Sequence, residues 1–243
     1  MWIDAIDLRD FYATTLGRVA RRAIRGRVRD FWPDTRGMRV LGIGYAAPYL
    51  DPFRGEAERV IAAMPAAQGV LPWPGEGAAL STLCDETELP FADLSVDRVL
   101  LVHALECAEH VHPMMREIWR VLGGGGRLLV VVPNRRGIWA RFERTPFGQG
   151  RPYSPGQLTR SLRESMFTPV RSRPALFVPP VTSRMLLSSA PALEKLGERW
   201  FRTFAGIILA EATKQIYAAQ PESREKARRK AYVPIAARRP GAP

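Results

Sequence analysis

Short apolar runs alternate with a helical pattern along the middle of the chain. The runs RVLGIG, ending at Gly44, RVLLVH, ending at His103, and LLVVV, over residues 128–132, are nearly continuous. Such runs are typical of strands that are covered on both faces. Between the last two, residues 113–122 repeat apolar side chains at helical spacing, and we expect the glycines of residues 123–126 to end that helix. The order strand, helix, strand predicts an α/β protein with a parallel sheet and helices on both faces.

The amino-terminal part has a different pattern. Residues 7–31 carry apolar side chains three or four positions apart, with arginines mostly on the other side. This spacing predicts one amphipathic helix that ends near Trp32 and Pro33. A basic helix lying on a membrane would have a similar pattern, but we favour a helix that packs on the main domain as a cover.

The remaining segments complete the predicted order of elements. Residues 58–63 predict a short strand, and residues 64–79 are rich in proline and glycine, which predicts an irregular loop. Residues 151–167 predict a turn and a helix capped by Ser154, and residues 205–217 predict a late, long strand. We therefore divide the chain into an amino-terminal helical cover (1–36), an α/β domain (37–220) and a basic, proline-rich tail (221–243) that we expect to be mobile.

Charge is distributed unevenly along the 243 residues. The net charge is +12, but residues 134–243 hold 21 Lys and Arg against 7 Asp and Glu, whereas the first 133 residues are close to neutral. The basic half would suit an acidic protein partner, a phosphate-bearing ligand or an anionic membrane surface, and solvated arginines would give the same count. Binding to nucleic acid is not favoured, because the excess is local.

Composition excludes several classes of protein. The two cysteines, Cys84 and Cys107, indicate neither a disulfide framework nor a metal site. No apolar run approaches the roughly 18 to 20 residues that span a bilayer, and the acidic first residues are unlike a signal peptide. We therefore expect a cytoplasmic protein without a metal or a transmembrane segment.

The segment RVLGIGYAAPYL, residues 39–50, predicts a strand, a glycine turn and a helix start. Gly42 and Gly44 permit a tight turn, and the backbone N–H groups that follow would face a ligand. Ligands of parallel sheets bind at the carboxyl ends of the strands. We therefore expect one crevice near residues 42–46, 62–64, Asp85 and His103.

Residues 85–134 carry a family resemblance. Asp85, LPF at residues 89–91, and Asp93 with SVD at residues 95–97 precede a strand, and HALE and REIWRVL follow at residues 103–106 and 116–122. This series resembles the S-adenosylmethionine-dependent methyltransferases, in particular their type 11 branch. The resemblance implies a Rossmann-like, seven-stranded, mostly parallel sheet with helices on both faces. It also implies methyl transfer from S-adenosylmethionine, in a pocket lined by Gly42, Gly44, Tyr45, Ala46, Met64, Asp85, Glu86 and His103.

The chain departs from the family pattern at the cofactor site. The family has a carboxylate at the end of the first strand, where this chain has Gly42, and a ribose-binding Asp or Glu at the end of the second, where it has Ala62-Ala63-Met64. Of three usual glycines only Gly44 remains, with Ala46 and Pro48 at the other positions. Each lost charged hydrogen bond is worth about 1.5 to 3 kcal/mol, so binding would weaken by roughly two to four powers of ten.

Single residues leave alternatives open. His103 is a candidate general base at a strand end, although a lone histidine there is more often structural. Tyr45 would either cover the pocket or fill it. Arg135, Arg136, Arg141 and Arg144 follow a strand near the expected substrate side and suit an anionic group, or form a solvated basic face.

Two functions therefore stand beside each other. The first is methyl transfer from S-adenosylmethionine to an unknown acceptor. The alternative is a catalytically inactive methyltransferase-fold protein that acts as a binding or regulatory partner through its basic carboxyl-terminal half. The partner would be a small molecule or an acidic protein.

Overall fold

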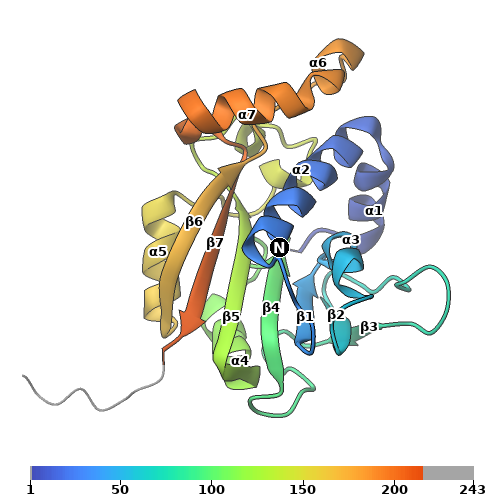
Figure 1. The fold of residues 1–243 in the computed structure, drawn as a ribbon, viewed down its shortest axis with the longest axis vertical. Coiled ribbons are helices and arrows are strands. Elements are labelled where there is room, and N and C mark those ends of the chain that lie inside the picture. The colour runs from blue at the N-terminus through green and yellow to red at the C-terminus, as the bar shows by residue number, and fades with distance from the viewer. Residues whose placement is uncertain (1, 216–243) are drawn as a thin grey trace, which may run out of the picture.

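The predicted α/β architecture is confirmed by a computed structural model, which describes residues 2–215. One seven-stranded sheet has the order β3-β2-β1-β4-β5-β7-β6, in which β7 runs antiparallel to both of its neighbours (Figure 1). The strands are β1 (Arg39–Gly44), β2 (Arg59–Pro65), β3 (Ser81–Cys84), β4 (Val96–Val102), β5 (Leu122–Pro133), β6 (Phe167–Ala175) and β7 (Ile207–Lys214). This is the Rossmann-like, mostly parallel sheet that the resemblance implies.

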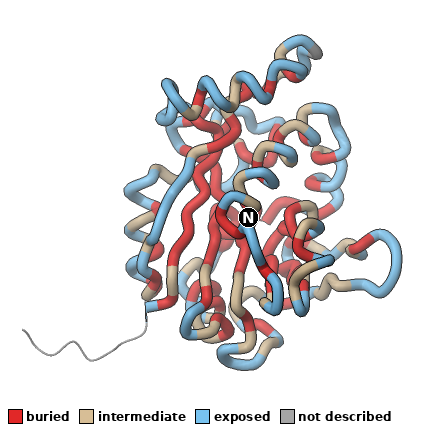
Figure 2. The backbone as a smooth tube through the Cα atoms, viewed as in Figure 1, coloured by how far each residue is buried: buried red, intermediate tan, exposed pale blue. Residues whose placement is uncertain are grey.

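Helices cover both faces of the sheet (Figure 1). The α-helices are α1 (Ala5–Ala13), α2 (Thr15–Phe31), α3 (Ala47–Leu50), α4 (Val111–Val121), α5 (Pro155–Glu164), α6 (Arg184–Ser188) and α7 (Ala190–Trp200). Short 3-10 helices are η1 (Asp51–Phe53), η2 (Trp139–Arg141), η3 (Pro146–Gly148) and η4 (Arg202–Phe204). The helices α1 to α3 lie on one face and α4 and α5 on the other, so the central strands are buried, as Figure 2 shows.

Two helices stand where the sequence predicts one, so that expectation is wrong in detail. The Thr14 hydroxyl accepts a hydrogen bond from Gly17 N at 3.0 Å and starts α2. A Cβ on Gly17 would lie 2.0 Å from the Phe11 carbonyl oxygen, so the glycine lets α2 fold back against α1. The predicted end of the amphipathic pattern is right, because α2 stops at Phe31 with Trp32 as its C-cap.

The glycines of residues 123–126 do not end a helix in the left-handed conformation, contrary to our expectation. The helix α4 ends at Val121, and the glycines belong to β5, which begins at Leu122. The edge strand β6 and the helices α6 and α7 were not predicted. The helix capped by Ser154 and the long late strand β7 were both predicted.

The division at residue 36 stays a prediction, and the proposed tail (221–243) lies outside the described residues. Side chains of α1 and α2, among them Leu8, Ile24 and Val28, belong to the same buried cluster as the sheet. No helix within residues 2–215 is long and apolar enough to cross a membrane.

Candidate functional site

The glycine turn after β1 has the strained geometry that a ligand-binding turn needs. Gly44 has φ +78°, and a Cβ on it would lie 2.4 Å from the Val102 carbonyl oxygen. The next residue, Tyr45, donates its backbone N–H to that same oxygen at 2.8 Å. The turn therefore clamps the end of β1 onto the end of β4, and only glycine fits there.

Three tyrosines fill the crevice that opens at these strand ends. The Tyr12 side chain, from α1, is buried, and its ring stacks on that of Tyr45 with centroids 5.8 Å apart and planes 5° apart. The Tyr12 hydroxyl accepts a hydrogen bond from the Tyr49 hydroxyl at 2.8 Å and lies 2.7 Å from His103 Nε2. Tyr45 is buried against Tyr12, a position that agrees with the filling role, and its role toward a ligand stays a prediction.

Burial keeps these phenols neutral. It raises the pKa of Tyr45 to about 12 and also raises the pKa values of Tyr12 and Tyr49 above the ordinary value of a tyrosine. Neutral hydroxyls can donate and accept hydrogen bonds but do not act as bases near neutral pH. The tyrosine cluster is therefore a packed, hydrogen-bonded plug.

His103 is buried and locked at the end of β4. Its backbone has φ +50°, an uncommon conformation for a residue with a side chain. Its carbonyl accepts a hydrogen bond from Gln68 Nε2 at 3.2 Å, and its Nδ1 lies 3.4 Å from Glu106 Oε1. Three buried atoms nearby, His103 Nδ1, Glu106 Oε2 and Gln68 Oε1, have no hydrogen-bond partner. A compact set of unsatisfied polar atoms thus lies under α1.

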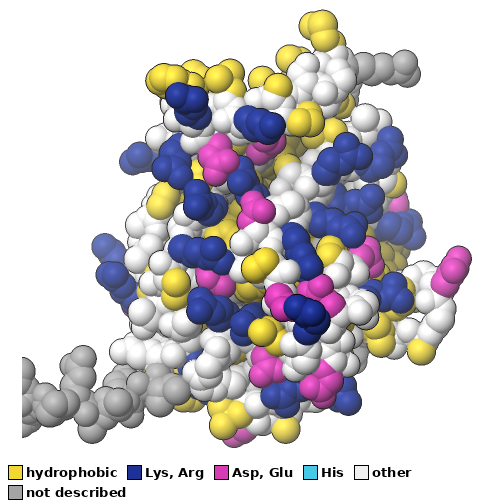
Figure 3. Space-filling model, viewed as in Figure 1, with side chains coloured by type: hydrophobic (Ala, Val, Ile, Leu, Met, Phe, Trp, Pro, Cys, Tyr) yellow, Lys and Arg dark blue, Asp and Glu magenta, His cyan; other side chains and the backbone are white. Residues whose placement is uncertain are grey.

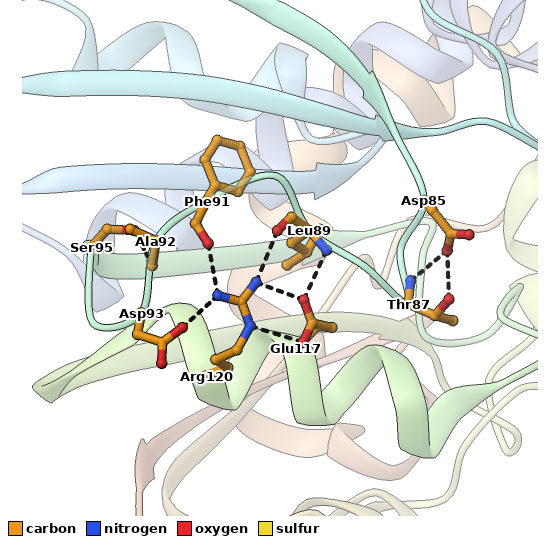
Figure 4. Close-up of polar contacts among 9 residues, drawn as sticks. All are labelled: Asp85, Thr87, Leu89, Phe91, Ala92, Asp93, Ser95, Glu117 and Arg120. Atoms are coloured by element: carbon orange, nitrogen blue, oxygen red, sulfur yellow. Dashed lines mark hydrogen bonds and ion pairs between the residues drawn. The ribbon is translucent and has the colours of Figure 1, made fainter.

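The other predicted cofactor residues are engaged within the protein. Asp85 Oδ1 accepts from Thr87 N at 2.7 Å and Thr87 Oγ1 at 2.6 Å, which lowers the pKa of Asp85 (Figure 4). Glu86 accepts from Trp2 Nε1 at 3.3 Å. Met64 is buried within β2 instead of following it. The structure brings Gly44, Tyr45 and His103 together, and one oxygen of each carboxylate at the β3 end accepts a hydrogen bond from the chain itself.

Two positions of the expected cofactor site lack the carboxylates that the family resemblance implies. A Cβ on Gly42 would lie 2.6 Å from Ala46 Cβ and 2.7 Å from Leu50 Cδ1, so this position has no space for a carboxylate. The last residues of β2 are Ala62, Ala63, Met64 and Pro65, none of which carries a carboxylate. Tyr12 and Tyr45 take up the space between the turn and His103.

A separate cavity of about 730 Å³ opens beside the α1–α2 junction. Its lining is largely apolar and includes Phe11, Leu16, Phe142 and Leu187, with Arg144 as the charged residue. The ring of Phe11 contacts Tyr12 edge to face, at 5.1 Å between centroids. The volume of this cavity lies within the range of small-molecule sites. Phe11, which lines the cavity, lies against Tyr12 of the tyrosine plug.

The arginines after β5 do not form one site. Arg144 lines the cavity just described, whereas Arg136 and Arg202 line a second cavity of about 320 Å³. Within residues 2–215, no group of His, Cys, Asp and Glu side chains could hold a metal ion. His110 is the N-cap residue of α4.

Sequence reasoning missed Tyr12, Tyr49, Gln68 and Glu106. Tyr12 lay inside a predicted helix, and Gln68 lay in a loop without periodicity. Their common role depends on contacts between residues up to 91 positions apart, which no local pattern records. Glu106 is part of the HALE match, but the resemblance gave it no role.

Comparison with known proteins indicates the same fold that the structure shows. Residues 35–130 match the family model of a methyltransferase domain. No curated protein matches the chain. Three similar solved structures, each less than 25% identical to this chain, share the fold.

The first is the complex between the Haloferax volcanii Trm112 methyltransferase activator and a candidate methyltransferase (17% identity, 88% of this chain and 100% of that chain, TM-score 0.59). The second is an S-adenosylmethionine-dependent methyltransferase from Archaeoglobus fulgidus (18%, 80% and 94%, 0.56). The third is the Burkholderia thailandensis 1,6-didemethyltoxoflavin-N1-methyltransferase with bound 1,6-didemethyltoxoflavin and S-adenosylhomocysteine (16%, 86% and 82%, 0.54).

Proposed function

We propose that this chain, which matches a methyltransferase-domain model over residues 35–130 and shares the methyltransferase fold, works as a binding protein and not as a methyl-transferring enzyme. The observation that carries the proposal is Tyr12 of α1, which is stacked on Tyr45 and bonded to His103 where a methyl donor would lie. A fold does not fix a function, and the residues at the site decide it.

Two independent losses support this proposal. The crevice is filled, and the two carboxylates that would grip the amino acid and ribose parts of the donor are absent. Their absence alone weakens binding by roughly two to four powers of ten. Displacing a packed tyrosine would add a further cost to binding. Together the two losses argue against donor binding at micromolar concentrations.

The proposed partner is a small molecule or an acidic protein. The cavity of about 730 Å³ with Arg144 suits an apolar molecule that carries an anionic group. A protein partner also has a precedent in this fold, since one similar structure was solved in complex with the Trm112 activator. In either case the basic carboxyl-terminal half would supply the binding charges.

A second candidate function is methyl transfer from a form in which α1 has moved away. The three unsatisfied atoms of His103, Glu106 and Gln68 favour it, because α1 covers polar groups that a ligand could bond. In that form Glu106 would be the carboxylate nearest to His103, and His103 would be the candidate base.

Calorimetry on the full chain separates the two functions. We expect no heat from S-adenosylmethionine or S-adenosylhomocysteine at millimolar concentration with the wild-type protein. We expect the same result with Tyr12→Ala, since that variant opens the crevice but restores no carboxylate. Micromolar binding by the wild type would overturn the proposal. Binding that appears only in Tyr12→Ala would show that α1 alone excludes the donor, and would establish the second candidate.

A further inference from the structure

We call the end of the molecule formed by α6, α7 and η4, residues 184–204, the cap. Its acidic side chains face the protein, and its large apolar side chains face outward. The carboxylates of α7 point inward. Glu194 accepts hydrogen bonds from Leu176 N at 3.1 Å and Phe177 N at 2.6 Å. Glu198 pairs with Arg27 of α2 and, at 3.7 Å, with Arg173 of β6. The polar face of α7 therefore attaches the cap to the protein.

The outward face of the cap is apolar and basic. Leu196 and Trp200 lie one helical turn apart, with 51% and 67% of their surfaces exposed, and Phe201 and Phe204 follow at 55% and 58%. The cations Lys195, Arg199 and Arg202 are exposed among them. The Arg199 guanidinium lies 5.5 Å from the centre of the Trp200 ring. In Figure 3 hydrophobic side chains gather at the top of the molecule, where α7 lies, with Lys and Arg beside them.

This concentration differs from ordinary scatter. Isolated exposed apolar residues are normal on soluble proteins. Within residues 2–215, however, five of the twelve large hydrophobic side chains that are exposed belong to the cap, namely Met185, Leu196, Trp200, Phe201 and Phe204. Because the helix also turns its acidic groups inward, the surface that remains combines aromatic rings with positive charge.

We propose that the cap docks on an anionic membrane surface. Aromatic side chains prefer the membrane interface, and lysine and arginine are attracted by anionic headgroups. A helix with this outward face lies in the interface without crossing it. The cavity of about 320 Å³ next to η4 adds a place for a headgroup phosphate, since Arg136 and Arg202 line it together with Asn134 and Thr203.

The proposal stands on observations separate from the filled crevice, so it can fail or succeed independently of the proposed function. It is tested by vesicle binding of the full chain, not by donor binding. Vesicles of phosphatidylcholine mixed with phosphatidylglycerol are compared with vesicles of phosphatidylcholine alone. We expect binding to the mixed vesicles only, weakened by salt. Brominated lipid should quench part of the tryptophan emission, and Trp200→Phe should remove that part while binding persists.

Variants locate the contact. Leu196→Ser, Trp200→Ser and Phe201→Ser should each lower vesicle affinity by about tenfold. Leu83→Ser and Val170→Ser, at exposed apolar positions of β3 and β6, are matched controls that should leave binding unchanged. Arg21→Ser with Arg25→Ser tests the arginine face of α2 and should also have little effect. The substituted side chains are exposed, apart from the half-buried Arg21, so folding should persist, and thermal melting checks this.

Three outcomes would overturn the proposal. The first is an absence of binding to mixed vesicles. The second is binding that ignores lipid charge or survives the cap substitutions. The third is self-association that the cap substitutions abolish while vesicles are not bound, which would make the cap a contact between copies of the chain.

Discussion

The two ends of the same sheet differ in what they retain of the family. At the amino ends of β4 and β5, Arg120 joins the parts of the matched segment (Figure 4). It donates to the carbonyl oxygens of Leu89 and Phe91 at 2.9 and 2.8 Å, and pairs with Asp93 and Glu117, each at 2.7 Å. At the carboxyl ends, the chain has Gly42 and Ala62-Ala63-Met64 where the resemblance implies carboxylates, and Tyr12 packs on Tyr45 there. The segment with the strongest resemblance thus stabilises the fold.

This difference limits what a family match implies. Glu117 accepts from Leu89 N at 2.9 Å, and Arg120 O accepts from Leu94 N at 3.0 Å, so the loop between β3 and β4 is fixed to α4 by contacts that involve no ligand. Such contacts hold the loop in place whether or not a cofactor binds. The match is therefore strong evidence for the fold and weak evidence for methyl transfer.

The largest effect is expected for Gly44→Ala. The new Cβ would lie 2.4 Å from the Val102 carbonyl oxygen, in a backbone conformation that strains any side chain. We expect the free energy of unfolding to fall by about 3 to 5 kcal/mol, measured by urea denaturation. Gly55→Ala, where a Cβ meets nothing within 4 Å, is the matched control and should change stability by less than about 0.5 kcal/mol. An unchanged stability of Gly44→Ala would mean that the turn is not a structural clamp.

The next effect is expected for Arg120→Ala, at the other end of the sheet. The change leaves two carbonyl oxygens and two carboxylates without their donor, and we expect a loss of about 2 to 4 kcal/mol. The stability of Arg120→Lys should lie between that of Arg120→Ala and that of the wild type. Arg116→Ala, on the exposed side of α4, should be nearly neutral. If Arg120→Ala changed donor or ligand binding but not stability, the amino ends of the strands would not serve the fold alone, and the comparison of the two ends of the sheet would be wrong.

Local patterns predict much of this fold. The buried strands, the capped helix α5 and the strand β7 follow from periodicity and capping residues, which act over a few positions. The strand β6 was missed because Pro169 and Pro174 argue against a strand. It lies at the edge of the sheet, where a missing N–H is tolerated.

Other features depend on distant contacts. The helix α7 was missed because Glu194 and Glu198, beside the few apolar residues Ala190 and Leu193, attach its inner face. The loss of the donor carboxylates at Gly42 and at the end of β2 was evident from the sequence. The tyrosine plug was not evident from the sequence, because the role of Tyr12 depends on its contact with the distant His103.

A smaller effect is expected for Tyr12→Phe, which keeps the stacked ring but removes the hydroxyl. His103 Nε2 and the Tyr49 hydroxyl then lose a buried partner, and stability should fall by about 1 to 2 kcal/mol. Amide hydrogen exchange in α1 should become faster while exchange in α4 does not change. Tyr45→Phe, which keeps the stacking partner, is the control. Equal exchange in α1 of both variants would show that the hydroxyl does not hold the cover.

The smallest effect concerns acid and tests a charged contact at the amino ends of the strands. Glu56 accepts from Arg29 at 2.6 and 2.8 Å and from Thr35, and these bonds lower the pKa of Glu56 from 4.5 to about 2. Arg120 also lowers the pKa of Glu117.

Because the folded pKa of Glu56 is below the unfolded value, its stabilisation is complete above pH 4.5 and is lost as the pH falls towards 2. Glu56→Gln should lower the free energy of unfolding by about 1 to 2 kcal/mol at neutral pH. This gap in stability between variant and wild type should close as the pH falls from 4.5 to 2. Urea denaturation at several pH values measures the gap, with the exposed Glu58→Gln as control. A gap of constant size would show that the carboxylate acts through hydrogen-bond geometry alone and that its charge does not help fasten the end of α2 beside the amino ends of β1 and β2.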